Sequence, residues 1–78
     1  MEIPAAHKIF MDQVVETYRE SLEKTFANPK YRGPKYHPDK LPGIVAELSI
    51  SVTALTLDGE WNPEYESYII ERSKKRSM

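Results

Sequence analysis

The longest regular pattern in this sequence is a helical one near its beginning. Residues 5–27, AAHKIFMDQVVETYRESLEKTFA, carry apolar side chains at the three- and four-residue spacing of an α-helix. The apolar arc contains Phe10, Met11, Val14, Val15, Tyr18, Leu22 and Phe26. Pro4 suits the start of a helix, where its missing N–H has no partner to lose, and Asn28-Pro29 stops it. We predict one long amphipathic helix whose apolar face must be covered by the rest of the chain.

The chain length limits how much surface can be buried. Its 78 residues form one small domain, 1–78, and a chain of this size buries only about 60% of the surface that its unfolded form exposes. A second copy is the simplest source of further stability, so we expect a homodimer. The sequence contains no cysteine, which excludes disulfides and thiolate metal sites.

The middle segment, IVAELSISVTALTLDG, fits two structures. Leu48, Ile50 and Val52 alternate with small polar residues and Asp58-Gly59 follows, as in a strand that enters a hairpin. On a helical wheel the same segment has two apolar stripes, one with Ile44, Val45, Leu48, Val52 and Leu55, the other with Ala46, Ile50, Thr53 and Leu57. The proline after the proposed hairpin weakens the strand alternative. We favour a helix over residues 40–57, with Asp39 as its cap and Leu48 on its core side.

The last segment carries the signals of a helix start and stop. Asn62 can cap, Pro63 suits the first turn, and Glu64 and Glu66 face the positive end of the helix dipole. Basic residues follow at the other end, and residues 72–78 are expected to be a frayed basic tail. The predicted fold is therefore an all-α, three-helix domain with a Pro/Gly-rich basic loop between helices 1 and 2. The alternative is an α+β domain with residues 48–57 as a strand.

The basic loop, NPKYRGPKYHPDKLPG at residues 28–43, has two interpretations. Positive charges among aromatic rings can bind phosphates and stack on bases, and the basic tail would extend such a site. The residues in question are Lys30, Arg32, Lys35, Lys40, Arg72, Lys74, Lys75 and Arg76. The alternative is a stiff connector, which the sequence pI of about 6.1 favours over a nucleic-acid-binding protein.

The sequence contains no recognisable catalytic constellation. His7 and His37 lie in different segments, and no nucleophile motif accompanies either of them. We place His7 in the core or at its rim. The glycines form no phosphate-binding pattern, and no spacing of His, Asp and Glu suggests a metal site. We predict that the protein is not an enzyme and uses no cofactor.

The doubly apolar middle helix favours a protein-binding function. A helix that is apolar on two sides cannot hide both against two neighbours in so short a chain. We therefore predict a small regulator or adaptor that binds another protein and self-associates, and nucleic-acid binding is the alternative. The predicted partner-binding residues are Ile50, Leu57, Trp61 and Tyr65.

The N-terminus has charges and proline where a signal peptide needs an unbroken apolar run. No segment is expected to span a membrane, which needs about 18 or more apolar residues. We therefore expect a soluble, cytoplasmic protein.

Overall fold

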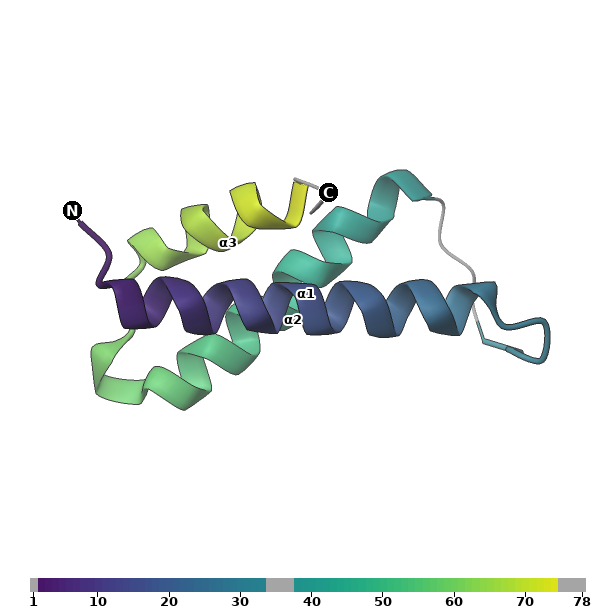
Figure 1. Cartoon of the computed structure of the whole chain (residues 1–78), viewed down its shortest axis with the longest axis horizontal. Helices are drawn as coiled ribbons and strands as arrows, with labels where there is room; N and C mark the ends of the chain where they lie inside the picture. Colours follow the sequence, from purple (N-terminus) through teal and green to yellow (C-terminus); the bar gives the residue numbers. More distant parts are fainter. Residues whose placement is uncertain (1, 34–37, 75–78) are drawn as a thin grey trace.

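The computed structural model describes residues 2–33 and 38–74, and these form three α-helices (Figure 1). The helices are α1 (Ala5–Ala27), α2 (Leu41–Leu57) and α3 (Glu64–Lys74), and the short 3-10 turns η1 (Pro38–Lys40) and η2 (Asp58–Glu60) flank α2. No strand occurs within the described ranges. The predicted three-helix fold is thus confirmed, and the strand alternative for residues 48–57 is wrong.

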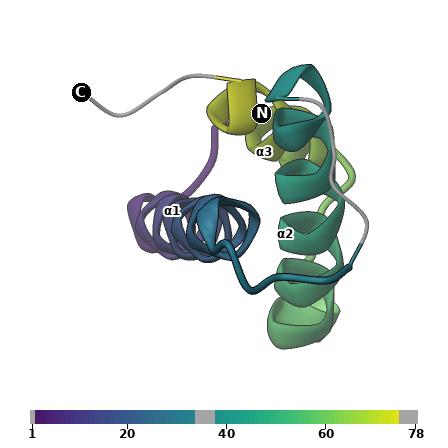
Figure 2. The same ribbon diagram turned by 90° about the vertical axis from the view of Figure 1, so that its right-hand side faces the viewer.

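Helix α1 runs along the longest dimension of the molecule, which measures 42 Å. Helix α2 crosses α1 obliquely, and α3 turns back beside both of them. Figure 2, which views the molecule from one end of α1, shows α2 beside α1 and α3 close to the upper part of α2. Each helix therefore contacts the other two, as a minimal three-helix core requires.

Helix α1 begins and ends, and helix α3 begins, where the sequence signals predicted. Pro4 directly precedes α1, and Asn28 ends it with extended backbone before Pro29. At α3 the Asn62 Oδ1 accepts a hydrogen bond of 2.8 Å from the Glu64 N–H, so the predicted cap is present. Acidic residues occupy the first turn of α3 and basic residues the last, which matches the helix dipole.

The two ends of α2 differ from the prediction in detail. Asp39 lies within η1, and Lys40 occupies the cap position without a side-chain hydrogen bond, so the expected Asp39 cap is wrong. Pro42 does lie in the first turn of α2, as expected. At the other end, Asp58 takes the positive φ of 45° that turns the chain toward α3, although Gly59 follows directly. With a ψ of −111°, Asp58 lies outside the left-handed helical region that Asp tolerates, so this turn strains a residue that carries a Cβ.

The core lies where the three helices meet. Its buried apolar members come in pairs from each helix, namely Met11 and Val15, Val45 and Ala46, and Tyr65 and Ile69. Each of these exposes 6% of its surface or less. Half-buried apolar side chains, among them Phe10, Leu22 and Trp61, pack around this core. The core is small, so individual side chains carry a large share of the stability.

The predicted basic tail is partly helical. Arg72, Ser73 and Lys74 form the end of α3, and Ser73 is buried there. The predictions at Lys35, His37, Lys75 and Arg76 lie outside the described residues.

Candidate interaction surfaces

Helix α3 is held on α1 by polar contacts at both of its ends. At its start, His7 Nδ1 lies 2.8 Å from the Tyr65 hydroxyl, and His7 Nε2 lies 3.7 Å from a Glu60 carboxylate oxygen. Near the middle, the Tyr68 hydroxyl donates a hydrogen bond of 2.7 Å to Asp12 Oδ1. The prediction that His7 belongs to the core or its rim is confirmed, because its side chain exposes only 18% of its surface.

Asp12 also holds the last turn of α3. Arg72 Nε lies 2.9 Å from Asp12 Oδ1, and since this N–H has no aligned acceptor the contact is an ion pair rather than a hydrogen bond. Burial is the main cause that raises the pKa of Tyr68 to about 12, and the hydrogen bond and charge of Asp12 add to it. Tyr68 therefore stays protonated and can donate to Asp12 throughout the neutral range.

The carboxyl end of α3 is capped from α1 by a buried cation. Arg19 Nη2 donates hydrogen bonds to the main-chain carbonyls of Arg72 and Ser73, and Arg19 exposes only 8% of its surface. The last carbonyls of a helix have no partner within the helix, and that end carries a partial negative charge. The Arg19 guanidinium meets both needs, so it fixes where α3 ends against α1.

Helix α2 is held by close packing instead. Its fully buried face consists of Val45, Ala46, Ser49 and Thr53, all small side chains. No α2 side chain forms a hydrogen bond or ion pair within the described part of the chain. The Ser49 and Thr53 hydroxyls are buried without a partner there, and such atoms cost free energy.

This packing corrects our assignment of the α2 faces. Leu48 was expected on the core side, but it is exposed by 37%, and Leu55 of the same stripe is exposed by 82%. Ile50 and Leu57, expected to face away, are half-buried and pack against the core. Small Ser and Thr side chains let α2 approach its neighbours closely, which turns the larger residues of the first stripe outward.

The outward stripe extends an apolar surface that crosses from α1 to α2. A hollow of about 350 Å³ between these helices is lined by Phe10, Gln13, Val14, Thr17, Tyr18, Ser21 and Val52. Leu48 and Leu55 flank Val52 at helical spacing. We call the residues Phe10, Val14, Tyr18, Leu48, Val52 and Leu55 the α1/α2 surface. None of the side chains that line the hollow is charged.

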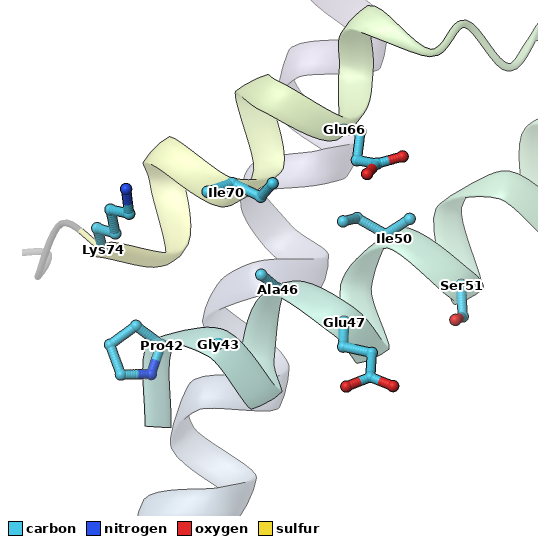
Figure 3. A pocket seen from close by; sticks show the side chains of 9 residues that line it. All are labelled: Pro42, Gly43, Ala46, Glu47, Ile50, Ser51, Glu66, Ile70 and Lys74. Atoms are coloured by element: carbon cyan, nitrogen blue, oxygen red, sulfur yellow. The ribbon is translucent and has the colours of Figure 1, made fainter. Parts of the chain in front are cut away.

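A second, larger depression lies between α2 and α3 and is shown in Figure 3. It has a volume of about 490 Å³ and is lined by Pro42, Gly43, Ala46, Glu47, Ile50, Ser51, Glu66, Ile70 and Lys74, which we call the α2/α3 groove. Ala46, Ile50 and Ile70 form its apolar part, while Glu47 and Glu66 lie on opposite helices. The groove lining thus includes two acidic side chains and one basic side chain, Lys74, whereas the lining of the α1/α2 hollow has no charge.

The predicted partner-binding residues do not form one patch. Ile50 lines the α2/α3 groove, whereas Leu57 and Trp61 are half-buried around the core. Tyr65 exposes 2% of its surface and contacts the rings of His7 and Trp61, so it serves the core of its own chain. The reason is that α3 is short, and its aromatic face lies against α1 and Trp61. Whether the other three bind a partner stays a prediction.

Of the predicted nucleic-acid-binding residues that the structure describes, some are exposed and others lie beside acidic side chains. Lys30, Arg32 and Lys40 are exposed. Arg72 is engaged with Asp12, and Lys74 lies 4.0 Å from Glu71. Tyr31, whose ring packs on Phe26, and the turn at Asn28 tie the start of the loop to the end of α1.

Sequence reasoning missed several surface residues that the structure brings together. Glu66 and Ile70 come from α3 to line the groove with Ile50, and Val14 meets Val52 across two helices. The sequence signal that could have identified them is side-chain size, because the small residues Ser49 and Thr53 mark where two helices can approach most closely. Nothing local in the sequence predicts pairs that depend on the crossing of α1 and α2.

Among the described residues, no group of three or more His, Asp and Glu side chains could hold a metal ion.

Leu41–Glu60 is, by length and composition alone, long and apolar enough to cross a membrane, and 22% of it is buried. Our expectation that no segment approaches this composition was therefore wrong. Core helices of soluble proteins pass the same test, so the feature by itself does not assign a location.

Comparison of the chain with protein families, curated proteins and solved structures found no match.

Proposed function

We propose that this chain is a non-catalytic protein–protein interaction module, a small regulator or adaptor, and that it self-associates through the α1/α2 surface. The observation that carries the proposal is the exposure of large apolar side chains on a surface without charge. Leu55 exposes 82% and Leu48 37%, next to the hollow that Val52 and Val14 line. Contiguous apolar patches of this kind mark interaction sites on small proteins.

The absence of charge favours a second copy as the occupant. In a two-fold dimer each patch packs against the same patch of the second copy. A patch with charges of one sign would therefore be repelled by its counterpart. The α1/α2 surface avoids this cost, whereas the α2/α3 groove, with Glu47 and Glu66 on its rim, does not. Two apolar surfaces that differ in charge are suited to two different partners.

Light scattering of the purified chain tests self-association. We expect a mass twice the 9.0 kDa of one chain at micromolar concentration. Leu55→Asp should give a monomer that keeps its helical circular dichroism, because a carboxylate is tolerated at an exposed position but not in an apolar interface. Ile9→Asp is the matched control, since Ile9 is exposed by 59% and lies outside the hollow. A wild-type monomer, or a dimer unaffected by Leu55→Asp, would rule the proposal out.

We further propose that the protein works in an aqueous compartment, the cytoplasm. The packing of α2 against both α1 and α3 supports this, because the core helix of a soluble three-helix domain packs in this way. Mixing the protein with neutral lipid vesicles and floating them in a density gradient tests this. The chain should stay with the soluble fraction, and recovery with the vesicles would contradict the proposal.

Nucleic-acid binding is the second candidate, and one observation favours it. Pro42 and Lys74 line the same groove, so the start of α2, with Lys40, lies near the end of α3, with its basic residues. The start of α2 and the basic end of α3 thus lie on the same side of the molecule. If they contact phosphates, affinity for a short oligonucleotide should fall steeply with salt, and Lys30→Ala with Arg32→Ala should flatten that dependence. No binding at low salt excludes this candidate.

A further inference from the structure

We propose that the α2/α3 groove binds a basic amphipathic helix of a partner protein, with apolar side chains in the groove and Lys or Arg side chains along its rim. This inference rests on the proposed function and names the chemistry of the partner. It concerns a different surface from the one that we assign to self-association, so the two assignments can fail separately.

The floor of the groove is shaped for apolar side chains. Ala46 is the smallest side chain that α2 directs toward α3, and it leaves space between Ile50 and Ile70 (Figure 3). Ile70 is exposed by 36%, although it lies over this space. A volume of about 490 Å³ has room for a few aliphatic side chains, such as those that a helix presents at positions i and i+4.

The rim selects the charge of the partner. Glu47 of α2 and Glu66 of α3 are both exposed, and neither forms an ion pair within the described ranges. The surrounding sequence reinforces them, because residues 44–71 contain six acidic residues and no Lys or Arg. Lys74, at the end of the groove near Pro42, already lies close to Glu71. An apolar floor between two acidic sides complements a helix that has basic residues beside its apolar stripe.

The first test uses two synthetic helical peptides of equal length. Both carry leucines at i, i+4 and i+7, and the flanking residues are lysines in one peptide and glutamates in the other. Binding to the full chain is measured by fluorescence anisotropy and mapped by amide chemical shifts. The lysine peptide should bind roughly fivefold or more tightly than the glutamate peptide, as expected for two exposed ion pairs. Its shifts should centre on Ala46, Ile50 and Ile70.

Two variants test the location of binding, each with a matched control. Gly43 lines the groove and has open space where a Cβ would be added, so Gly43→Leu should narrow the groove without disturbing the fold. Gly59 is equally open but lies outside the groove, so Gly59→Leu is its control. Glu47→Gln with Glu66→Gln removes the acidic rim, and Glu16→Gln with Glu20→Gln removes the same charge from α1.

The expected result is weaker binding of the lysine peptide by several-fold for each groove variant and unchanged binding for each control. Equal affinity for the two peptides, equal effects of variant and control, or shifts centred on Val14 and Val52 would overturn the assignment of the groove. A dimer that persists while the groove binds no peptide rejects this inference alone. A monomer that binds the peptide in the groove rejects self-association alone.

Discussion

Helices α2 and α3 are attached to α1 in opposite ways. Helix α3 has few apolar residues, and its position depends on directional polar contacts with His7, Asp12 and Arg19. Helix α2 is the most apolar part of the chain, yet its buried face consists of small side chains whose hydroxyls have no partner within the described residues. Helix α3 thus adds hydrogen bonds to its apolar packing, whereas α2 is held by packing alone in the described part of the chain.

This difference explains why α2 is the helix with apolar surface to spare. Because small residues are used for close approach to α1, the larger ones, Leu48 and Leu55, remain outside. In α3 the opposite holds, since Tyr65, one of its two tyrosines, is in the core and its surface carries mostly charge. The apolar surface available for a partner is therefore largely a consequence of how α2 packs.

The largest effect should come from shortening a buried side chain of α3. Ile69 has no exposed surface, so Ile69→Ala should lower the free energy of unfolding by about 2 to 5 kcal/mol. The same change at exposed Ile9 should cost less than about 0.5 kcal/mol. Urea unfolding followed by circular dichroism measures both. Similar losses at the two positions would mean that α3 does not pack as described.

The next largest effect tests the polar attachment of α3. Arg19→Met removes the donor to the Arg72 and Ser73 carbonyls while keeping an apolar side chain of similar length. We expect a loss of about 1.5 to 3 kcal/mol, because the hydrogen bonds are charge-assisted and the helix end is left unpaired. A urea midpoint equal to that of the wild type would show that the cap does not stabilise α3.

The corresponding change in α2 should have the opposite sign. Ser49→Ala removes a buried hydroxyl without a partner and barely alters side-chain volume. The free energy of unfolding should stay the same or rise by up to about 1 kcal/mol, since an unsatisfied polar atom is lost. If Ser49→Ala instead destabilises the protein as much as Arg19→Met does, α2 and α3 are attached alike and the contrast between them disappears.

The smallest effect concerns pH. The Tyr68 pKa is raised to about 12 from 10.0 in the folded chain, mainly by burial and then by Asp12. The folded state therefore holds this proton more tightly than the unfolded state, and stability from it is complete below pH 10 and is lost as the pH rises through 12. Urea midpoints between pH 9 and 11 should fall more in the wild type than in Tyr68→Phe. Parallel curves would contradict the role given to Tyr68.

Local signals in the sequence were enough for α1 and α3, because their limits depend on nearby residues such as Pro4, Asn28 and Asn62. They also favoured a helix for the middle segment. Local signals could not predict the orientation of α2, because a helix that is apolar on several sides has no single face to direct inward. Ser49 belongs to neither of the two apolar stripes predicted for this segment, yet it is fully buried. The Asp12–Tyr68 contact joins residues 56 positions apart, so it follows only from the fold.

Paramagnetic broadening of amide signals in one copy by a spin label on another copy tests self-association through the α1/α2 surface most directly. The chain has no cysteine, so Thr56→Cys, at an exposed position next to Leu55, gives a single nitroxide site. Labelled chain is mixed with unlabelled ¹⁵N wild-type chain, in which broadening can arise only between copies. We expect broadened amides at Val14, Tyr18 and Val52 and unaffected amides at Ile70. An unbroadened spectrum, or broadening centred on the α2/α3 groove, would contradict the account.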